Sequence, residues 1–192
     1  MNRTDIPNLP ERIWICGFMG AGKSTVGRLL AERLEVPFAD LDRRVARQAD
    51  MEISEIFREE GEEGFRRRER AWLKKAMREA SGVIALGGGS LQNQSLVDDL
   101  KLNGLLIFID TPFSVIFERI RKDTGRPLAD AAGEPGADHE KGREALQALL
   151  ERRRPLYEQA ELSLRLDPDE RQDPEQMVDQ LMDKIRLHVS HL

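Results

Sequence analysis

A glycine-rich segment near the N-terminus limits the fold of this chain more than any other part of the sequence. Residues 17–24 read GFMGAGKS and match the pattern G-x-x-x-x-G-K-[ST]. The apolar run 13–16 precedes the segment, and apolar residues recur at helical spacing after it, from Val26 to Leu34. A strand, a glycine-rich turn and a helix in this order form a loop whose backbone N–H groups face phosphate oxygens, at the positive end of a helix dipole. The segment therefore predicts a phosphate-binding loop at the carboxyl end of a buried strand.

The residue types in this loop favour a nucleoside triphosphate with a divalent cation. Lys23 can contact the β- and γ-phosphates of ATP as a point charge, and the hydroxyl of Ser24 can bind Mg²⁺. We expect the remaining phosphate contacts from Gly20, Ala21, Gly22 and Thr25. ATP and Mg²⁺ are therefore the predicted cofactors.

Short apolar segments alternate with helical patterns through the rest of the chain. We predict strands at residues 37–40, 83–86, 105–109 and 162–166, and helices at 43–49, 53–60, 65–80, 95–102, 112–122, 141–153 and 177–185. This alternation is typical of an α/β fold with a parallel sheet between helices. Ligands of such sheets bind beyond the carboxyl ends of the strands, so the residues directly after each strand are the candidates for a site.

Length and composition predict one domain over residues 1–192, because this length with 40% hydrophobic content suffices for one core. Residues 1–11 are polar and are expected to form a loose tail. Residues 123–142 combine glycines and mixed charges with little apolar periodicity, which indicates either a functional lid or a disordered insertion. Because no long apolar face lies outside the predicted core, we expect a monomer.

Charge and cysteine content argue against several classes of protein. The net charge is −5 and aromatic residues make up 5% of the chain, so nucleic-acid binding is not expected. Cys16 is the single cysteine, which excludes an intramolecular disulfide and disfavours a cysteine-based zinc site. No stretch approaches the roughly 20 apolar residues of a membrane span, and the N-terminal residues lack the apolar core of a signal peptide. We therefore expect a cytoplasmic protein that binds no membrane.

Two carboxylates, Asp40 and Asp42, follow the second predicted strand. One carboxylate near a phosphate-binding loop can hold Mg²⁺ through water, because Mg²⁺ loses its water ligands reluctantly. Residues two apart in an extended chain face the same side, so both carboxylates could address one site. The alternative for Asp42 is to cap a helix that begins at Arg43, and spacing alone does not separate the two interpretations.

Arginines and a glycine triplet suggest where an acidic second substrate would bind. Arg66 follows Phe65 in a basic cluster, which indicates that one arginine turns inward and can bind a carboxylate in bidentate fashion. The alternative is a solvated helix face with i,i+4 ion pairs. The triplet 87–89 follows an apolar strand and lets backbone N–H groups approach a ligand, although an ordinary loop would look similar. Arg126 and residues 152–154 flank the possible lid, where they can reach phosphates or merely favour a helix C-terminus.

Taken in order, these motifs carry a family resemblance. The chain resembles shikimate kinases from residue 13 to the last predicted helix, through GFMGAGKST, the DLD pair, GEEGFRRRE, GGG, RPL and RRPLY. The phosphate-binding loop occurs in many enzymes, whereas the other segments in combination are far more specific. The resemblance implies a three-layer fold similar to nucleoside monophosphate kinases, with a five-stranded parallel sheet and a mobile lid. It also implies ATP-dependent phosphorylation of the 3-hydroxyl of shikimate, giving shikimate 3-phosphate and ADP, in aromatic amino acid biosynthesis.

For the nucleotide and the reaction, the resemblance implies that Lys23 stabilises phosphoryl transfer and that Asp42 orients the attacking hydroxyl. Arg126 would approach the transferred group of ATP from the lid. Ser24, with Asp40 through water, would hold Mg²⁺.

For the substrate and the base, the resemblance implies that Arg66 and Arg153 bind the shikimate carboxylate, with Gly88 as a backbone donor between Gly87 and Gly89. Arg119 would lie near the adenine. Residues 129–142 (ADAAGEPGADHEKG) lengthen the usual lid of the family. We therefore predict an enlarged mobile lid.

Three alternatives remain open at this point. A related kinase for gluconate or for a nucleotide would keep the same phosphate-binding loop. A non-catalytic ATP-binding regulator would not need the full set of Lys23, Ser24, Asp40 and Asp42. A nucleic-acid binder would use the basic clusters 66–68 or 152–154, against the negative net charge.

Overall fold

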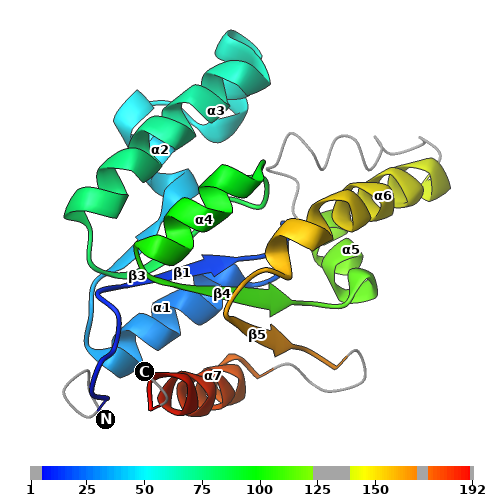
Figure 1. The fold of residues 1–192 in the computed structure, drawn as a ribbon. Coiled ribbons are helices and arrows are strands. Elements are labelled where there is room, and N and C mark those ends of the chain that lie inside the picture. The colour runs from blue at the N-terminus through cyan, green and yellow to red at the C-terminus, as the bar shows by residue number, and fades with distance from the viewer. Residues whose placement is uncertain (1–5, 123–138, 168–172, 191–192) are drawn as a thin grey trace.

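A parallel β-sheet between two layers of helices forms the body of the protein (Figure 1). The computed structural model describes residues 6–122, 139–167 and 173–190. Its five-stranded sheet has the order β2-β3-β1-β4-β5, and every neighbouring pair of strands is parallel. The strands are β1 (Arg12–Cys16), β2 (Phe38–Asp40), β3 (Gly82–Ala85), β4 (Leu105–Asp110) and β5 (Leu162–Arg165). The predicted α/β class and five-stranded parallel sheet are confirmed.

Alternation of side chains along the strands divides the core into two parts. In β1, Trp14 and Cys16 face one cluster of buried residues, and Ile13 and Ile15 face the other. Helices α2 to α6 cover the first cluster, and α1 and α7 cover the second (Figure 1). Because both faces of the sheet are buried, its central strands are almost continuously apolar. The predicted three layers are confirmed.

The helices lie at the predicted positions, although several of them are longer than predicted. They are α1 (Lys23–Leu34), α2 (Leu41–Ala49), α3 (Ile53–Glu79), α4 (Gln94–Leu102), α5 (Phe113–Lys122), α6 (His139–Tyr157) and α7 (Pro174–Val189). Helix α3 covers both predicted helices and is kinked at Gly61, which has φ 69° and ψ −178°. The helix predicted over 141–153 ended before Pro155, but α6 continues through this proline to Tyr157, whose ring is buried in the core. Burial of an apolar ring outweighs the local preference of proline here.

The predicted lid and the predicted N-terminal tail lie partly outside the described residues. Of the predicted lid, 123–142, only residues 139–142 are described, and they form the first turn of α6. Arg126 also lies outside. Of the predicted tail, residues 6–11 are described, and the side chain of Ile6 is only 3% exposed against the core cluster beneath α1 and α7.

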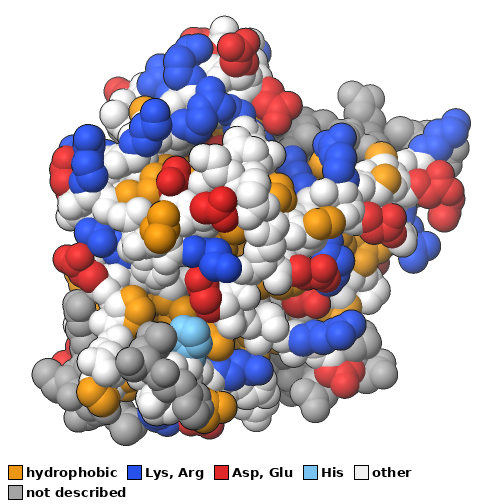
Figure 2. Space-filling view, viewed as in Figure 1, with side chains coloured by type: hydrophobic (Ala, Val, Ile, Leu, Met, Phe, Trp, Pro, Cys, Tyr) orange, Lys and Arg blue, Asp and Glu red, His pale blue; other side chains and the backbone are white. Residues whose placement is uncertain are grey.

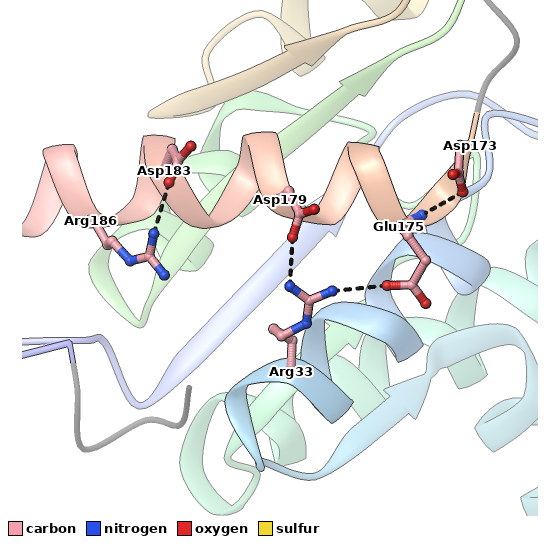
Figure 3. A network of polar contacts seen from close by, with 6 residues as sticks. All are labelled: Arg33, Asp173, Glu175, Asp179, Asp183 and Arg186. Carbon is pink, nitrogen blue, oxygen red and sulfur yellow. Dashed lines mark hydrogen bonds and ion pairs between the residues drawn. The ribbon is translucent and has the colours of Figure 1, made fainter.

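Helix α7 is attached to α1 by polar and apolar contacts. Arg33, in the last turn of α1, donates to Asp179 at 2.5 Å and to Glu175 at 2.9 Å (Figure 3). These exposed ion pairs contribute little to stability because water screens them. Burial of apolar residues such as Leu181 and Ile185 therefore dominates the attachment of α7.

No helix in the described parts of the chain is both long and apolar enough to cross a bilayer.

Candidate functional site

The phosphate-binding loop lies between β1 and α1, where the sequence predicted it. Gly17 and Gly22 have φ of +143° and +96°, which residues with a side chain rarely adopt. A Cβ atom at Gly17 would also lie 2.7 Å from the backbone oxygen of Ile109 on β4. The glycines are therefore required both by the turn and by its close approach to the neighbouring strand.

Three contacts hold this loop in place. The Nζ of Lys23 donates to the backbone oxygen of Phe18 at 2.8 Å, and the lysine side chain is buried. Thr111, directly after β4, donates its hydroxyl to the backbone oxygen of Ala21 at 2.8 Å. Arg119 on α5 donates to the backbone oxygen of Gly20 at 3.0 Å, and desolvation lowers the pKa of this arginine. Arg119, which was predicted near the adenine, therefore contacts the phosphate-binding loop. Thr111 is one of the residues that directly follow strands, but the sequence assigned it no specific role.

Ser24 and Asp40, the predicted metal pair, lie within hydrogen-bond distance. The hydroxyl of Ser24 donates to Oδ2 of Asp40 at 2.5 Å. The other carboxylate oxygen of Asp40 accepts the backbone N–H of Arg43 at 3.2 Å and caps α2. A hydroxyl and a single carboxylate suit Mg²⁺, which prefers oxygen ligands and keeps several of its waters.

Asp42 occupies a different local structure from the one predicted. The capping residue of α2 is Asp40, and Asp42 lies in the first turn of that helix. The argument from an extended chain is therefore wrong, because the strand ends at Asp40. Helical geometry nevertheless directs Asp42 toward the glycine triplet: a Cβ atom at Gly87 would lie 2.6 Å from its Oδ1.

Arg66 turns inward from α3, as predicted. Its side chain is 8% exposed, and its guanidinium lies 5.2 Å from the centre of the Phe65 ring. It donates to Glu69 at 2.9 Å and to Glu62 at 3.4 Å, and its buried Nε has no partner within the described residues. Arg67 points outward with 66% of its side chain exposed. Figure 2 shows Lys and Arg side chains over the outer surface of α3, and the exposure of Arg67 fits the solvated-face interpretation for this neighbour of Arg66.

Glu69 and Ser90 form a buried link between α3 and the glycine triplet. Glu69 is 1% exposed and accepts the hydroxyl of Ser90 at 2.5 Å, in addition to its bond with Arg66. Sequence analysis missed both roles. The spacing of three residues between Arg66 and Glu69 is a detectable signal for their ion pair. Ser90 carried no such signal.

The glycine triplet brings the two predicted substrate arginines together. A Cβ atom at Gly89 would lie 2.4 Å from Nη2 of Arg66 and 3.1 Å from Nη2 of Arg153. Arg153 also donates to the backbone oxygen of Gly88 at 3.0 Å and lies 5.9 Å from the centre of the Phe18 ring. Desolvation lowers the pKa of Arg153, and the nearby Arg66 acts in the same direction. Two convergent, partly desolvated guanidinium groups form a site suited to an anion such as a carboxylate.

A cavity of about 340 Å³ lies beside the phosphate-binding loop. Its lining includes Arg119 and most of the loop residues predicted to bind the nucleotide, among them Lys23 and Ser24. Pro174 and Met177, from the start of α7, complete the lining. Sequence analysis placed a helix there but missed its part in the site, because no local pattern relates α7 to the loop.

Comparisons with known proteins agree with this geometry. The family model described as shikimate kinase matches residues 19–186. A shikimate kinase from Persephonella marina is 35% identical over 92% of this chain and 99% of its own length, and one from Chlorobium phaeobacteroides is 38% identical over 82% of this chain and 79% of its own. The solved shikimate kinase from Acinetobacter baumannii in complex with shikimate is 32% identical, with a TM-score of 0.81 over 98% of each chain. A gluconokinase from Sinorhizobium meliloti, with 17% identity and a TM-score of 0.56 over 95% of each chain, shares the fold alone.

Proposed function

The chain belongs to the shikimate kinase family, and we propose that it transfers the γ-phosphoryl group of ATP to the 3-hydroxyl of shikimate. The products are shikimate 3-phosphate and ADP. The observation that carries this proposal is the convergence of Arg66 and Arg153 at Gly89, across the glycine triplet from the phosphate-binding loop. A Cβ atom at Gly88 would lie 2.6 Å from the backbone nitrogen of Met19 in that loop, so the acceptor and donor sites adjoin.

On the donor side, the backbone of the phosphate-binding loop and Lys23 bind the phosphates of ATP. Lys23 already lies over the loop through its bond to Phe18, so its charge is held where negative charge develops during transfer. Ser24 and Asp40 would hold Mg²⁺, which neutralises phosphate charge when bound. The base of ATP occupies the cavity between Arg119 and the start of α7, where Pro174 offers an apolar surface.

On the acceptor side, Arg66 and Arg153 bind the carboxylate of shikimate, and backbone N–H groups of the triplet add donors. Asp42, which faces Gly87 from α2, accepts hydrogen bonds from ring hydroxyls and orients the attacking oxygen. Phosphoryl transfer asks little covalent chemistry of the protein, so positioning and charge neutralisation supply most of the acceleration. Arg126 keeps its predicted role as a second cation at the transferred group.

Release of ADP from ATP and Mg²⁺ tests the acceptor directly. Wild-type protein is assayed with shikimate, gluconate, a nucleoside monophosphate or no acceptor, and we expect turnover with shikimate alone. Arg66→Met should raise KM for shikimate by about 30-fold or more, because it removes a buried charge that pairs with the substrate. Arg67→Met, the exposed neighbour on the same helix, is the matched control and should leave KM unchanged. Turnover with gluconate instead of shikimate would refute the assignment of the acceptor, whereas the assignment of the ATP-binding site would still stand.

The proposal includes a single kinase domain that acts as a monomer in the cytoplasm. These three points rest on the sequence: its length, its lack of a second apolar face, and its single cysteine. Light scattering at assay concentrations tests the monomer, since a mass near twice 21.9 kDa would contradict it.

A further inference from the structure

Tyr157, the last residue of α6, is buried at the acceptor site and has no part in the function proposed so far. Its side chain is 1% exposed, and its ring stacks on Phe108 of β4 with ring centres 5.4 Å apart. The apolar part of the ring is explained by this packing. The hydroxyl is not, because a buried tyrosine hydroxyl needs a hydrogen-bond partner.

The partner of that hydroxyl is the backbone oxygen of Gly88, to which Tyr157 donates at 2.6 Å. Arg153, one helical turn earlier in α6, donates to the same oxygen at 3.0 Å. A carbonyl oxygen has two lone pairs, so it accepts both bonds at once. Burial raises the pKa of Tyr157, so the hydroxyl keeps its proton and remains a donor across the working pH range.

Holding the Gly88 carbonyl also determines where the next N–H group points. The carbonyl of Gly88 and the N–H of Gly89 belong to one planar trans peptide and point in opposite directions. Within the described chain, neither Gly88 nor Gly89 donates its N–H to a backbone acceptor. Gly89 lies between the guanidinium groups of Arg66 and Arg153, which is where the carboxylate of the acceptor is expected.

Consecutive glycines make this arrangement easy to lose. Glycine adopts positive and negative φ almost equally well, so a peptide between two glycines can turn over at low cost. In the reversed orientation, a carbonyl oxygen would face the substrate carboxylate and repel it. A fixed donor on the opposite side of the peptide selects the orientation that attracts the carboxylate.

We propose that Tyr157 is a positioning residue for the acceptor site: its hydroxyl holds the Gly88 carbonyl and so keeps the backbone N–H groups of the triplet directed at the substrate carboxylate. This inference rests on the proposed function for the identity of the acceptor. The hold of Tyr157 on Gly88 is a property of the unliganded protein and can be measured without any acceptor.

The first experiment observes the peptide itself by NMR. When glycine is labelled with ¹³C at the carbonyl and ¹⁵N at the amide, a carbonyl-to-amide correlation shows only amides preceded by another glycine. The sequence contains such pairs only at 87–88 and 88–89, so two signals report on this loop. In Tyr157→Phe, which keeps the stacked ring, we expect the Gly88 carbonyl signal to move upfield as its hydrogen bond is lost. In Leu150→Ala, which removes a buried α6 side chain from the same core cluster, we expect it to stay in place.

The second experiment separates positioning from stability. Tyr157→Phe should raise KM for shikimate about fivefold, in keeping with the loss of one neutral hydrogen bond, with kcat and KM for ATP near wild type. Leu150→Ala should lower the thermal midpoint more and leave KM for shikimate unchanged. With an acceptor analogue that carries a neutral amide in place of the carboxylate, Tyr157→Phe and wild type should have equal KM.

An unmoved Gly88 signal in Tyr157→Phe overturns the inference, as does an equal loss of affinity for the neutral analogue. If wild-type protein does not phosphorylate shikimate, the proposed function is refuted, and the NMR spectra still decide whether Tyr157 holds the glycine triplet.

Discussion

Replacing Glu69 with glutamine tests how the buried carboxylate holds the acceptor site. Glu69 is 1% exposed and accepts from Arg66 at 2.9 Å and from Ser90 at 2.5 Å. Glutamine keeps the shape and can keep both contacts, because the hydroxyl of Ser90 can accept from the new amide. What is lost is the negative charge opposite a buried guanidinium, whose other partner, Glu62, is 67% exposed and 3.4 Å away.

The lost negative charge determines how much stability Glu69→Gln should lose. A hydrogen bond to a charged group contributes about 1.5–3 kcal/mol and a neutral one about 1, so Glu69→Gln should lower the free energy of unfolding by about 2 kcal/mol. For a chain of this length, that corresponds to a fall of about 4–8 °C in Tm. Glu69→Ala, which leaves the guanidinium without its buried partner, should cost about 4 kcal/mol.

The same change should weaken the acceptor site, because a neutral partner holds the Arg66 guanidinium beside Gly89 less firmly than a carboxylate does. We expect KM for shikimate to rise about tenfold in Glu69→Gln, with KM for ATP unchanged. Differential scanning calorimetry and steady-state kinetics measure the two effects. Glu63→Gln is the matched control, since it removes the same charge from an exposed position on the same helix. A Glu69→Gln protein with wild-type Tm and wild-type KM would falsify the idea that this ion pair holds Arg66 in place.

Three further predictions concern the donor site, the core and the sheet. Asp40→Asn keeps the oxygen that caps α2, so its Tm should stay close to wild type. The Mg²⁺ concentration for half-maximal activity should rise about tenfold or more in this variant. Asp40→Ala should in addition lose about 1 kcal/mol of unfolding free energy, measured by urea unfolding. Burial raises the pKa of Cys16 from 9.0 to about 12, so the stability that its protonated thiol contributes is present below the unfolded pKa and is lost as pH rises through this window. The urea midpoint should therefore fall between about pH 8 and pH 10 less steeply in Cys16→Ala than in wild type, and identical slopes would contradict this. Gly82 has φ +90°, and a Cβ atom there would lie 2.1 Å from the backbone oxygen of Pro37. Gly82→Ala should therefore lower the free energy of unfolding by more than about 1 kcal/mol. An unchanged urea midpoint would contradict this and show that the strand can move aside.

The sequence by itself determined the α/β class, the strand positions and the phosphate-binding loop. These features depend on residues close together in the chain: a period of two or 3.6 in apolar residues, and glycines where the loop requires positive φ. The pair Ser24 and Asp40 was also predictable, because Ser24 belongs to the loop that follows β1 and Asp40 ends β2, and the carboxyl ends of parallel strands meet at one edge of the sheet.

Only the tertiary structure decided which groups hold the site together. The bond from Ser90 to Glu69 spans 21 residues, and the bond from Tyr157 to Gly88 spans 69. No local period relates such residues, and although the position beside Phe65 favoured an inward Arg66, the sequence left a solvated helix face open as the alternative. Burial in the folded protein decides which polar side chains take part in the site, because a buried charge or hydroxyl must find a partner. That partner is supplied by whichever distant segment packs against it.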